Sequence, residues 1–220
     1  MRQAQRAWDR IEPAWRSSFE LAWESFVAGS VPVGAVVTDA SGIIVARGRA
    51  RSMEGAAAPG QLANATVAHA EINALGQVPV GPHAGYAIYT TLEPCVMCTG
   101  AIVVANIGIV RYAGADALWT GLERLPELNA FIAGRWPRRV GPRKDELGAF
   151  AALLPLLFYV ERHPSGATAA SHAEVAPELL DLARGLVASG EHRRWAALSM
   201  TDALEALWPR LAPLARQHER

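Results

Sequence analysis

One histidine, one glutamate and two cysteines have the types and the spacing of a metal centre that performs chemistry. His69 and Glu71 are separated by one alanine, and Cys95 and Cys98 follow in the segment Pro-Cys-Val-Met-Cys. One imidazole and two thiolates leave the fourth position of a tetrahedral zinc open, which is typical of a catalytic zinc because structural zinc sites close all four positions with protein ligands. A zinc ion of this kind lowers the pKa of bound water to around 7, and Glu71 is the nearby carboxylate that can carry the proton.

These residues also occur in other kinds of site. A Cys-x-x-Cys pair by itself also occurs in redox sites and zinc ribbons. A ribbon needs a second pair, whereas the chain has only two cysteines, and a redox motif leaves His69 and Glu71 without a role. A structural or inactive metal site remains the alternative. His172-Ala173-Glu174 repeats the His-Ala-Glu tripeptide without a cysteine pair, and we interpret it as surface or linker sequence.

The surrounding sequence predicts the elements that must position these residues. An amphipathic helix over residues 8–26, ending near Gly29, places its aromatic stripe in the core. The pattern then predicts a hairpin with strands over residues 33–39 and 43–47, followed by a long polar loop over 50–68. A helix capped by Thr66 is predicted over 69–77 and a strand over 86–91. A helix that carries both cysteines follows over 94–106, and a further strand over 107–113. Cys95 and Cys98 then lie one turn apart at a helix start, where the helix dipole favours thiolates. His69 and Glu71 converge only if His69 sits at the edge of its helix.

The order of strands and helices predicts an α/β layer structure with helices on a sheet. After Gly114 the pattern predicts a helix over 122–133, a basic solvated loop over 135–143 that contains Arg135, Arg138 and Arg139, and a helix over 146–161 that breaks or kinks at Pro155. A linker begins at His163, and helices follow over 177–187 and 192–207. We therefore expect one domain over residues 1–162 that holds the metal residues, and a linker with a helical C-terminal extension over residues 163–220.

The composition excludes several classes of protein. Hydrophobic residues make up 51% of the 220 residues, and 21 basic side chains balance 21 acidic ones, so the net charge is zero. A nucleic-acid partner is therefore not expected, because phosphate-binding proteins usually carry a basic excess. Two cysteines cannot build a disulfide scaffold, which favours a reducing, cytoplasmic location. No secretory signal is visible, and the longest apolar runs are shorter than the roughly 20 residues of a membrane span.

Three stretches carry a resemblance to a known family. They are Val-Pro-Val-Gly-Ala-Val-Val over residues 31–37, His-Ala-Glu over 69–71, and Thr-Leu-Glu-Pro-Cys-Val-Met-Cys-Thr-Gly-Ala-Ile over 91–102. There the chain resembles the cytidine deaminase-like superfamily, whose zinc-dependent nucleobase deaminases share an H-x-E…P-C-x-x-C signature. It is most similar to the branch of tRNA adenosine deaminases, bacterial guanine deaminases and fungal-type cytosine deaminase.

The resemblance implies a three-layer α/β/α fold with a mixed central sheet of about five strands, to which this chain adds C-terminal helices. It implies that His69, Cys95 and Cys98 bind Zn²⁺ and that Glu71 carries protons. The backbone amides of Ala70 and Cys95 hold water and substrate, and the protein forms a homodimer. Residues 1–162 are then a zinc-dependent deaminase domain.

One departure from the branch concerns substrate recognition. Ala50 stands where the branch has an asparagine that hydrogen-bonds the base, and Asn64 in the long loop is the candidate replacement. We therefore expect a hydrolytic deaminase that releases ammonia from a small aminated heterocycle, namely a free nucleobase, a nucleoside or a related metabolite, with a purine-like ring favoured. Besides this small molecule and water, no nucleic-acid or membrane partner is expected. A tRNA adenosine deaminase is the alternative, and a non-catalytic zinc-stabilised scaffold is a further one.

Overall fold

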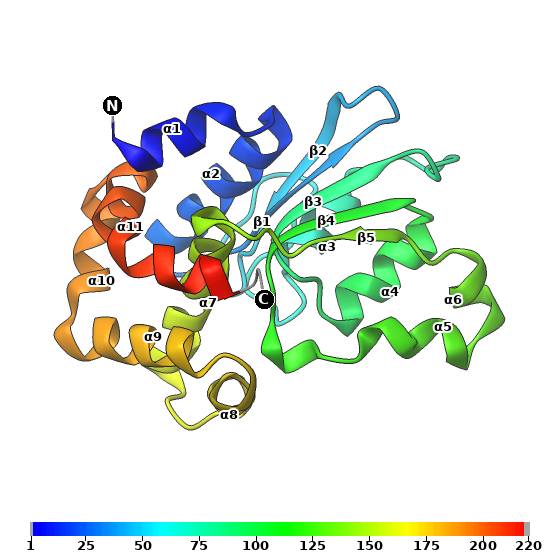
Figure 1. Cartoon of the computed structure of the whole chain (residues 1–220). Coiled ribbons are helices and arrows are strands. Elements are labelled where there is room, and N and C mark those ends of the chain that lie inside the picture. The colour runs from blue at the N-terminus through cyan, green and yellow to red at the C-terminus, as the bar shows by residue number, and fades with distance from the viewer. Residues whose placement is uncertain (1, 218–220) are drawn as a thin grey trace.

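A mixed five-stranded sheet forms the centre of the protein in a computed structural model that describes residues 2–217 (Figure 1). The strand order is β2-β1-β3-β4-β5, with bounds β1 Gly34–Thr38, β2 Ile44–Arg49, β3 Ala87–Leu92, β4 Ile109–Gly114 and β5 Arg138–Val140. Strand β1 pairs antiparallel with both β2 and β3, whereas β3, β4 and β5 run parallel. The carboxyl ends of β3 and β4 therefore meet at one edge of the sheet, which is where ligand sites form in α/β proteins.

Helices cover both faces of this sheet. Helices α2 (Pro13–Val27) and α7 (Glu146–Arg162) pack on one face, and α3 (Ala70–Leu75) and α4 (Val96–Ala105) cover the other. A separate cluster of buried apolar side chains fills each interface. The predicted three-layer α/β/α class with about five strands is confirmed.

Two glycines let helices approach the sheet more closely than any side chain would permit. A Cβ atom at Gly34 of β1 would lie 2.1 Å from the carbonyl oxygen of Ser18 in α2. A Cβ atom at Gly48 of β2 would lie 2.3 Å from the carbonyl oxygen of Ala70 in α3. Such separations are far inside van der Waals contact, so glycine at position 48 determines how close α3, and with it His69, lies to the sheet.

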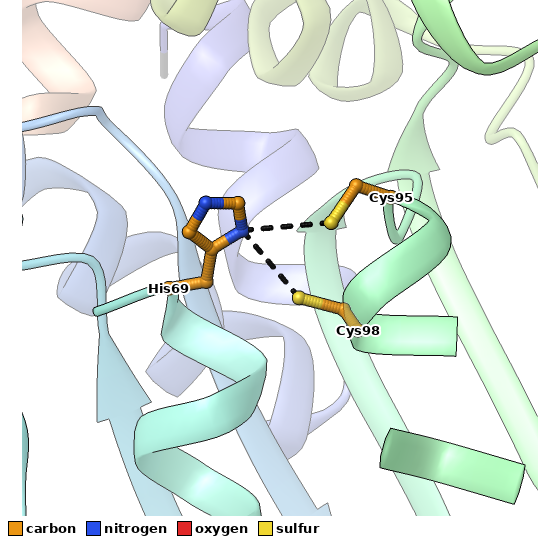
Figure 2. Close-up of side chains that lie close together, drawn as sticks. All are labelled: His69, Cys95 and Cys98. Carbon is orange, nitrogen blue, oxygen red and sulfur yellow. Dashed lines mark hydrogen bonds between the residues drawn. The ribbon is translucent and has the colours of Figure 1, made fainter. Parts of the chain in front are cut away.

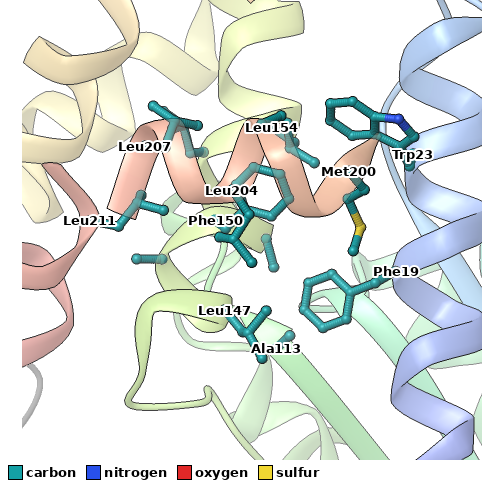
Figure 3. Packing of buried hydrophobic residues seen from close by; sticks show 14 of the residues in the cluster. Phe19, Trp23, Ala113, Leu147, Phe150, Leu154, Met200, Leu204, Leu207 and Leu211 are labelled. Atoms are coloured by element: carbon teal, nitrogen blue, oxygen red, sulfur yellow. The ribbon is translucent and has the colours of Figure 1, made fainter. Parts of the chain in front are cut away.

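The C-terminal helices share the core of the α2–α7 face. Helices α8 (Ala167–Val175), α9 (Pro177–Ser189), α10 (Glu191–Arg194) and α11 (Met200–Gln217) follow α7, and α9 and α11 pack against it. Figure 3 shows the α11 side chains Leu204, Leu207 and Leu211 beside Phe150 and Leu154 of α7. Helix α11 also contacts α1 (Gln3–Arg10), so the first and last described helices lie side by side.

Several predicted helices differ from the observed ones in where they begin, continue or end. The single N-terminal helix over 8–26 is two helices, α1 and α2, because Pro13 begins the second one. Helix α7 continues through Pro155, where a break or kink was predicted. The predicted linker after His163 is short, since residues 167–175 form α8. The predicted helix over 122–133 is three short helical pieces, and the predicted helix over 192–207 is α10, a short 3₁₀ turn and the start of α11.

The prediction of a solvated basic loop over 135–143 is confirmed for the exposed Arg135 and Arg138 but was wrong for Arg139 and for the strand at its centre. Residues 138–140 form β5, and the Arg139 side chain is only 9% exposed. Its guanidinium donates to Glu93 Oε1 at 2.5 Å and lies over the ring of Tyr112. A three-residue edge strand with two arginines has no alternating apolar pattern, so the sequence did not indicate it. Within residues 2–217, no helix is both long enough and apolar enough to cross a membrane.

Candidate active site

Two helix starts bring the predicted metal ligands together. His69 is the N-cap residue of α3 and Cys95 is the N-cap residue of α4, and both have extended backbones. Cys98 follows in the first turn of α4. Figure 2 shows the three side chains pointing toward one another from these two helices. The predicted position of His69 at the edge of its helix is confirmed, whereas Thr66 is not the cap, because His69 itself occupies that position.

The three donor atoms have the spacing that zinc requires. Nδ1 of His69 lies 3.6 Å from Sγ of Cys95 and 3.5 Å from Sγ of Cys98. All three donor atoms are within 4.8 Å of one another. A tetrahedral zinc with ordinary Zn–S and Zn–N bond lengths separates a nitrogen from a sulfur by about 3.6 Å. The donor set and its spacing therefore fit a zinc ion held by one imidazole and two thiolates.

Hydrogen bonding among these groups already favours one thiolate. The pKa of Cys95 is lowered to about 4, because the Cys98 side chain donates a hydrogen bond to it, with further hydrogen bonds from His69 and from the backbone of Cys98. The pKa of the Cys98 thiol is raised by the same bond and by burial. The pKa of His69 is raised by its hydrogen bond to Cys95. The predicted effect of the helix start on thiolate formation agrees with the backbone contribution at Cys95.

Glu71 lies beside the metal ligands and is almost fully buried, with 3% of its surface exposed. Its Oε1 accepts a hydrogen bond from Thr90 Oγ1 at 3.0 Å, and its Oε2 lies 3.4 Å from Cys98 Sγ. Burial is the main reason that the pKa of Glu71 is raised. A carboxyl group with a raised pKa that is fixed beside a metal site is suited to take up and release a proton during a reaction.

A cavity of about 240 Å³ opens in front of these residues, and we call it the site cavity. Its wall includes the predicted substrate-contact residues Ala70 and Cys95, and Ala50 lines it as well. The structure does not bring Asn64 to this cavity. Asn64 is an exposed loop residue with a left-handed backbone, and its N–H donates to the carbonyl oxygen of Arg51.

The buried amide of this region is instead Asn73 of α3. Its Nδ2 donates to the carbonyl oxygens of Arg49 and Leu62 at 2.9 and 3.1 Å, and its Oδ1 accepts from the N–H of Leu62 at 2.6 Å. These bonds fasten the long loop over 50–68 to α3. Asn73 therefore has a structural role in holding the loop that contributes Ala50 and Ser52 to the cavity wall.

Sequence reasoning missed a second group of cavity residues. They lie after β3, after β4, on α7 and on α8, and they are Glu93, Asp116, Trp119, Tyr159 and Thr168. Asp116 follows the carboxyl end of β4. Ligands bind beside the carboxyl ends of parallel strands in α/β proteins, so the parallel pairing of β3 and β4 would have indicated this residue. Nothing in the sequence indicated the contributions of α7 and α8. His172 of α8 was also misinterpreted as surface, since it is buried and its Nδ1 contacts the carbonyl oxygen of Thr168 at 2.8 Å.

Comparison with known families agrees with this geometry. Residues 9–113 match the model of the family described as the cytidine and deoxycytidylate deaminase zinc-binding region. This match confirms the predicted resemblance to the cytidine deaminase-like superfamily. Together with the His69, Cys95 and Cys98 cluster, the match identifies zinc as the cofactor.

Individual relatives cover different parts of the chain. A tRNA(Ile)-lysidine synthase of Deinococcus radiodurans is 38% identical over 132 residues, which are 58% of this chain and 21% of that protein. A cytosine deaminase of Candida albicans is 29% identical, covering 49% of this chain and 68% of the enzyme. A tRNA-specific adenosine deaminase of Streptococcus pyogenes is also 29% identical, covering 49% of this chain and 60% of the enzyme.

A solved structure has the same fold. The crystal structure of a mutant of NE0047 in complex with 8-azaguanine aligns with a TM-score of 0.50 and 24% identity, covering 67% of this chain and 84% of that one. The chain spans only about a fifth of the Deinococcus synthase. Two of these relatives are named for tRNA, so the comparisons give no support to the expectation that nucleic acid is not a partner.

Proposed function

We propose that the protein is a zinc-dependent hydrolytic deaminase that acts on a small aminated heterocycle and releases ammonia. The observation that carries this proposal is the buried Glu71 carboxyl group, which lies 3.4 Å from the sulfur of Cys98 and faces the site cavity. A structural zinc site has no need of such a group. The substrate is a free nucleobase, a nucleoside or a related metabolite, and the 8-azaguanine bound by a structural relative supports a purine-like ring.

The residues of the chain divide the work of this reaction. His69, Cys95 and Cys98 hold zinc, which supplies Lewis acidity and an acidified water. Glu71 accepts a proton from the attacking water and delivers it to a ring nitrogen. It then takes the second proton from the hydroxyl group on the tetrahedral carbon and gives it to the departing amine, so that the C–N bond breaks as the C=O bond forms and ammonia leaves. Thr90 fixes the carboxyl group by its 3.0 Å hydrogen bond. Backbone N–H groups of Ala70 and Cys95 orient the water and the heterocycle.

The proposal is tested by ammonia release from zinc-loaded protein across aminated purines, pyrimidines, pterins and triazines. We expect one substrate class to react and Glu71→Gln to lower the rate by about 10²–10⁴-fold, because proton transfer by a positioned group contributes that much. Glu20→Gln makes the same change at an exposed site on α2 and should leave the rate unchanged. Full activity of Glu71→Gln at unchanged zinc content would refute the assigned role.

A tRNA adenosine deaminase is the second candidate, favoured by the name of the Streptococcus pyogenes relative. The measurement that separates it is a mobility shift with tRNA at physiological salt, combined with ammonia release from the same tRNA. Tight binding that weakens steeply with salt supports it, since phosphate contacts release counterions. The neutral net charge and Ala50 in the cavity wall favour the small substrate instead.

We also propose a homodimer and a reducing, cytoplasmic location. Three exposed apolar side chains support a second copy of this chain as the partner, with Val104 on α4 at 68%, Leu128 on α5 (Leu125–Leu128) at 75% and Phe131 on α6 (Ala130–Gly134) at 52% exposed. Arg135 joins them, because it stacks on Phe131 and donates to the carbonyl oxygen of Val104. Light scattering of the zinc-loaded protein, and of Leu128→Lys, tests the dimer. The location would keep both thiols reduced.

A further inference from the structure

The site cavity has an acidic wall. Glu71, Glu93 and Asp116 line it, and no lysine or arginine is among the described residues that do so. Arg139 is not part of the lining, but its ion pair with Glu93 offsets the charge of that carboxyl group, so Glu71 and Asp116 give the wall its acidic character. Like charges in a cavity of low dielectric repel strongly, so a phosphate group is a poor occupant of this space.

Asp116 is held in a fixed position with one acceptor oxygen to spare. Its Oδ1 accepts the N–H of Leu118 at 3.0 Å, and its own N–H donates to Glu93 Oε2 at 3.3 Å. Among the described residues, none donates a hydrogen bond to its Oδ2. Asp116 is half-buried, and its Oδ2 is not a buried unpaired atom. Water or a substrate donor can therefore reach this oxygen, and hydrogen bonds to a charged acceptor are among the stronger ones.

The rest of the wall suits a flat, neutral ring. Leu118, Trp119 and Tyr159 supply apolar and aromatic surface, on which a planar heterocycle can stack. The volume of about 240 Å³ is below the ~300–1,000 Å³ of pockets that enclose drug-sized ligands. Ala50 has no polar side-chain atom to contribute. Glu93 uses both of its oxygens, for Arg139 and for the N–H of Asp116, so among the carboxyl groups of the wall outside the proton carrier, Asp116 is the one with an oxygen available to a substrate donor.

We propose that Asp116 selects the substrate of this site by accepting a hydrogen bond from a ring N–H or an amino group away from the reacting carbon, and that the acidic wall excludes phosphorylated nucleotides. The substrate class is therefore a phosphate-free base or nucleoside with a second donor. This inference rests on the proposed deaminase function and makes Asp116 a specificity residue of that reaction.

The test is a binding measurement on zinc-loaded Glu71→Gln protein, in which turnover is suppressed. The probes are adenine, guanine and cytosine, with their nucleosides and nucleoside 5′-monophosphates, measured by calorimetry. We expect at least one base or nucleoside to bind and its monophosphate to bind at least about tenfold more weakly. Adding Asp116→Asn should weaken the binding of the base or nucleoside by about 10- to 100-fold, which is the range for loss of a hydrogen bond to a charged group. It should also reduce the difference in affinity between the unphosphorylated ligand and its monophosphate.

The amide of Asp116→Asn can still accept the Leu118 N–H, so the local turn is kept, and zinc content and melting temperature verify this. Asp181→Asn makes the same change on the exposed face of α9 and should leave all affinities unchanged. The proposal would be overturned by equal affinity for base and monophosphate, or by an Asp116→Asn variant that binds as tightly as its parent. Ammonia release by the wild-type protein would still support the deaminase function in that case. If no probe binds and no substrate releases ammonia, both proposals fail.

Discussion

Replacing Leu204 by alanine asks whether the C-terminal helices and the zinc site form one cooperative unit. Leu204 of α11 is fully buried in the same cluster as Phe19, Phe150 and Leu154 (Figure 3). Removal of three carbon atoms costs about 2.4 kcal/mol at about 0.8 kcal/mol per buried methylene, and the remaining cavity raises the total to about 3–4 kcal/mol. This loss is a large fraction of the roughly 5–15 kcal/mol that stabilises an ordinary domain.

The assay is urea unfolding of the zinc-loaded protein, followed in parallel by tryptophan fluorescence and by zinc release to a chromophoric indicator. We expect both transitions to move to lower urea by the same amount, because the helices after residue 163 pack directly on α7. Leu198→Ala removes the same atoms from a side chain that is 41% exposed and should cost less than about 0.5 kcal/mol.

This reasoning would be refuted if the fluorescence transition moved to lower urea and the zinc-release transition did not. Residues 163–220 would then unfold independently of the domain over residues 1–162.

Three further predictions concern the metal, the packing of α3 and the dependence of stability on pH. Cys98→Ser should lower zinc content below one ion per chain after dialysis, because a ligand thiolate is lost; stoichiometric zinc by mass spectrometry would contradict this. Gly48→Ala should cost about 1–3 kcal/mol in urea unfolding and weaken zinc binding, since its Cβ would lie 2.3 Å from the Ala70 carbonyl oxygen; wild-type values for both would be inconsistent with the close approach. The Arg210 hydrogen bond is the main cause that lowers the pKa of Glu191, so the stability it gives is present above the ordinary glutamate pKa and is lost as the pH falls through the lowered value. Arg210→Gln should therefore lower stability at pH 7 by at most about 0.5 kcal/mol and have no effect at pH 2, and an equal loss at both values would contradict the linkage.

Local chemistry determined much of this protein. The spacing of His69, Glu71 and the two cysteines identified the metal ligands and the carboxyl group, because ligand identity and distance along the chain are written in the sequence. Runs of β-branched and other apolar residues predicted β1 to β4, and Pro94 marked the start of the helix that carries both cysteines. These features depend on neighbours within a few residues, so they can be predicted without knowledge of the tertiary structure.

The substrate side of the site was decided by tertiary structure alone. Asp116 reaches the cavity because parallel pairing places the ends of β3 and β4 at one edge, and Tyr159 and Thr168 reach it because α7 and α8 fold back toward that edge. Asn64 misses it, since the long loop turns its side chain to solvent. Arg139 changes from an expected solvent charge to a buried partner of Glu93. Such contacts join residues tens of positions apart, and packing rather than local pattern determines which of them meet.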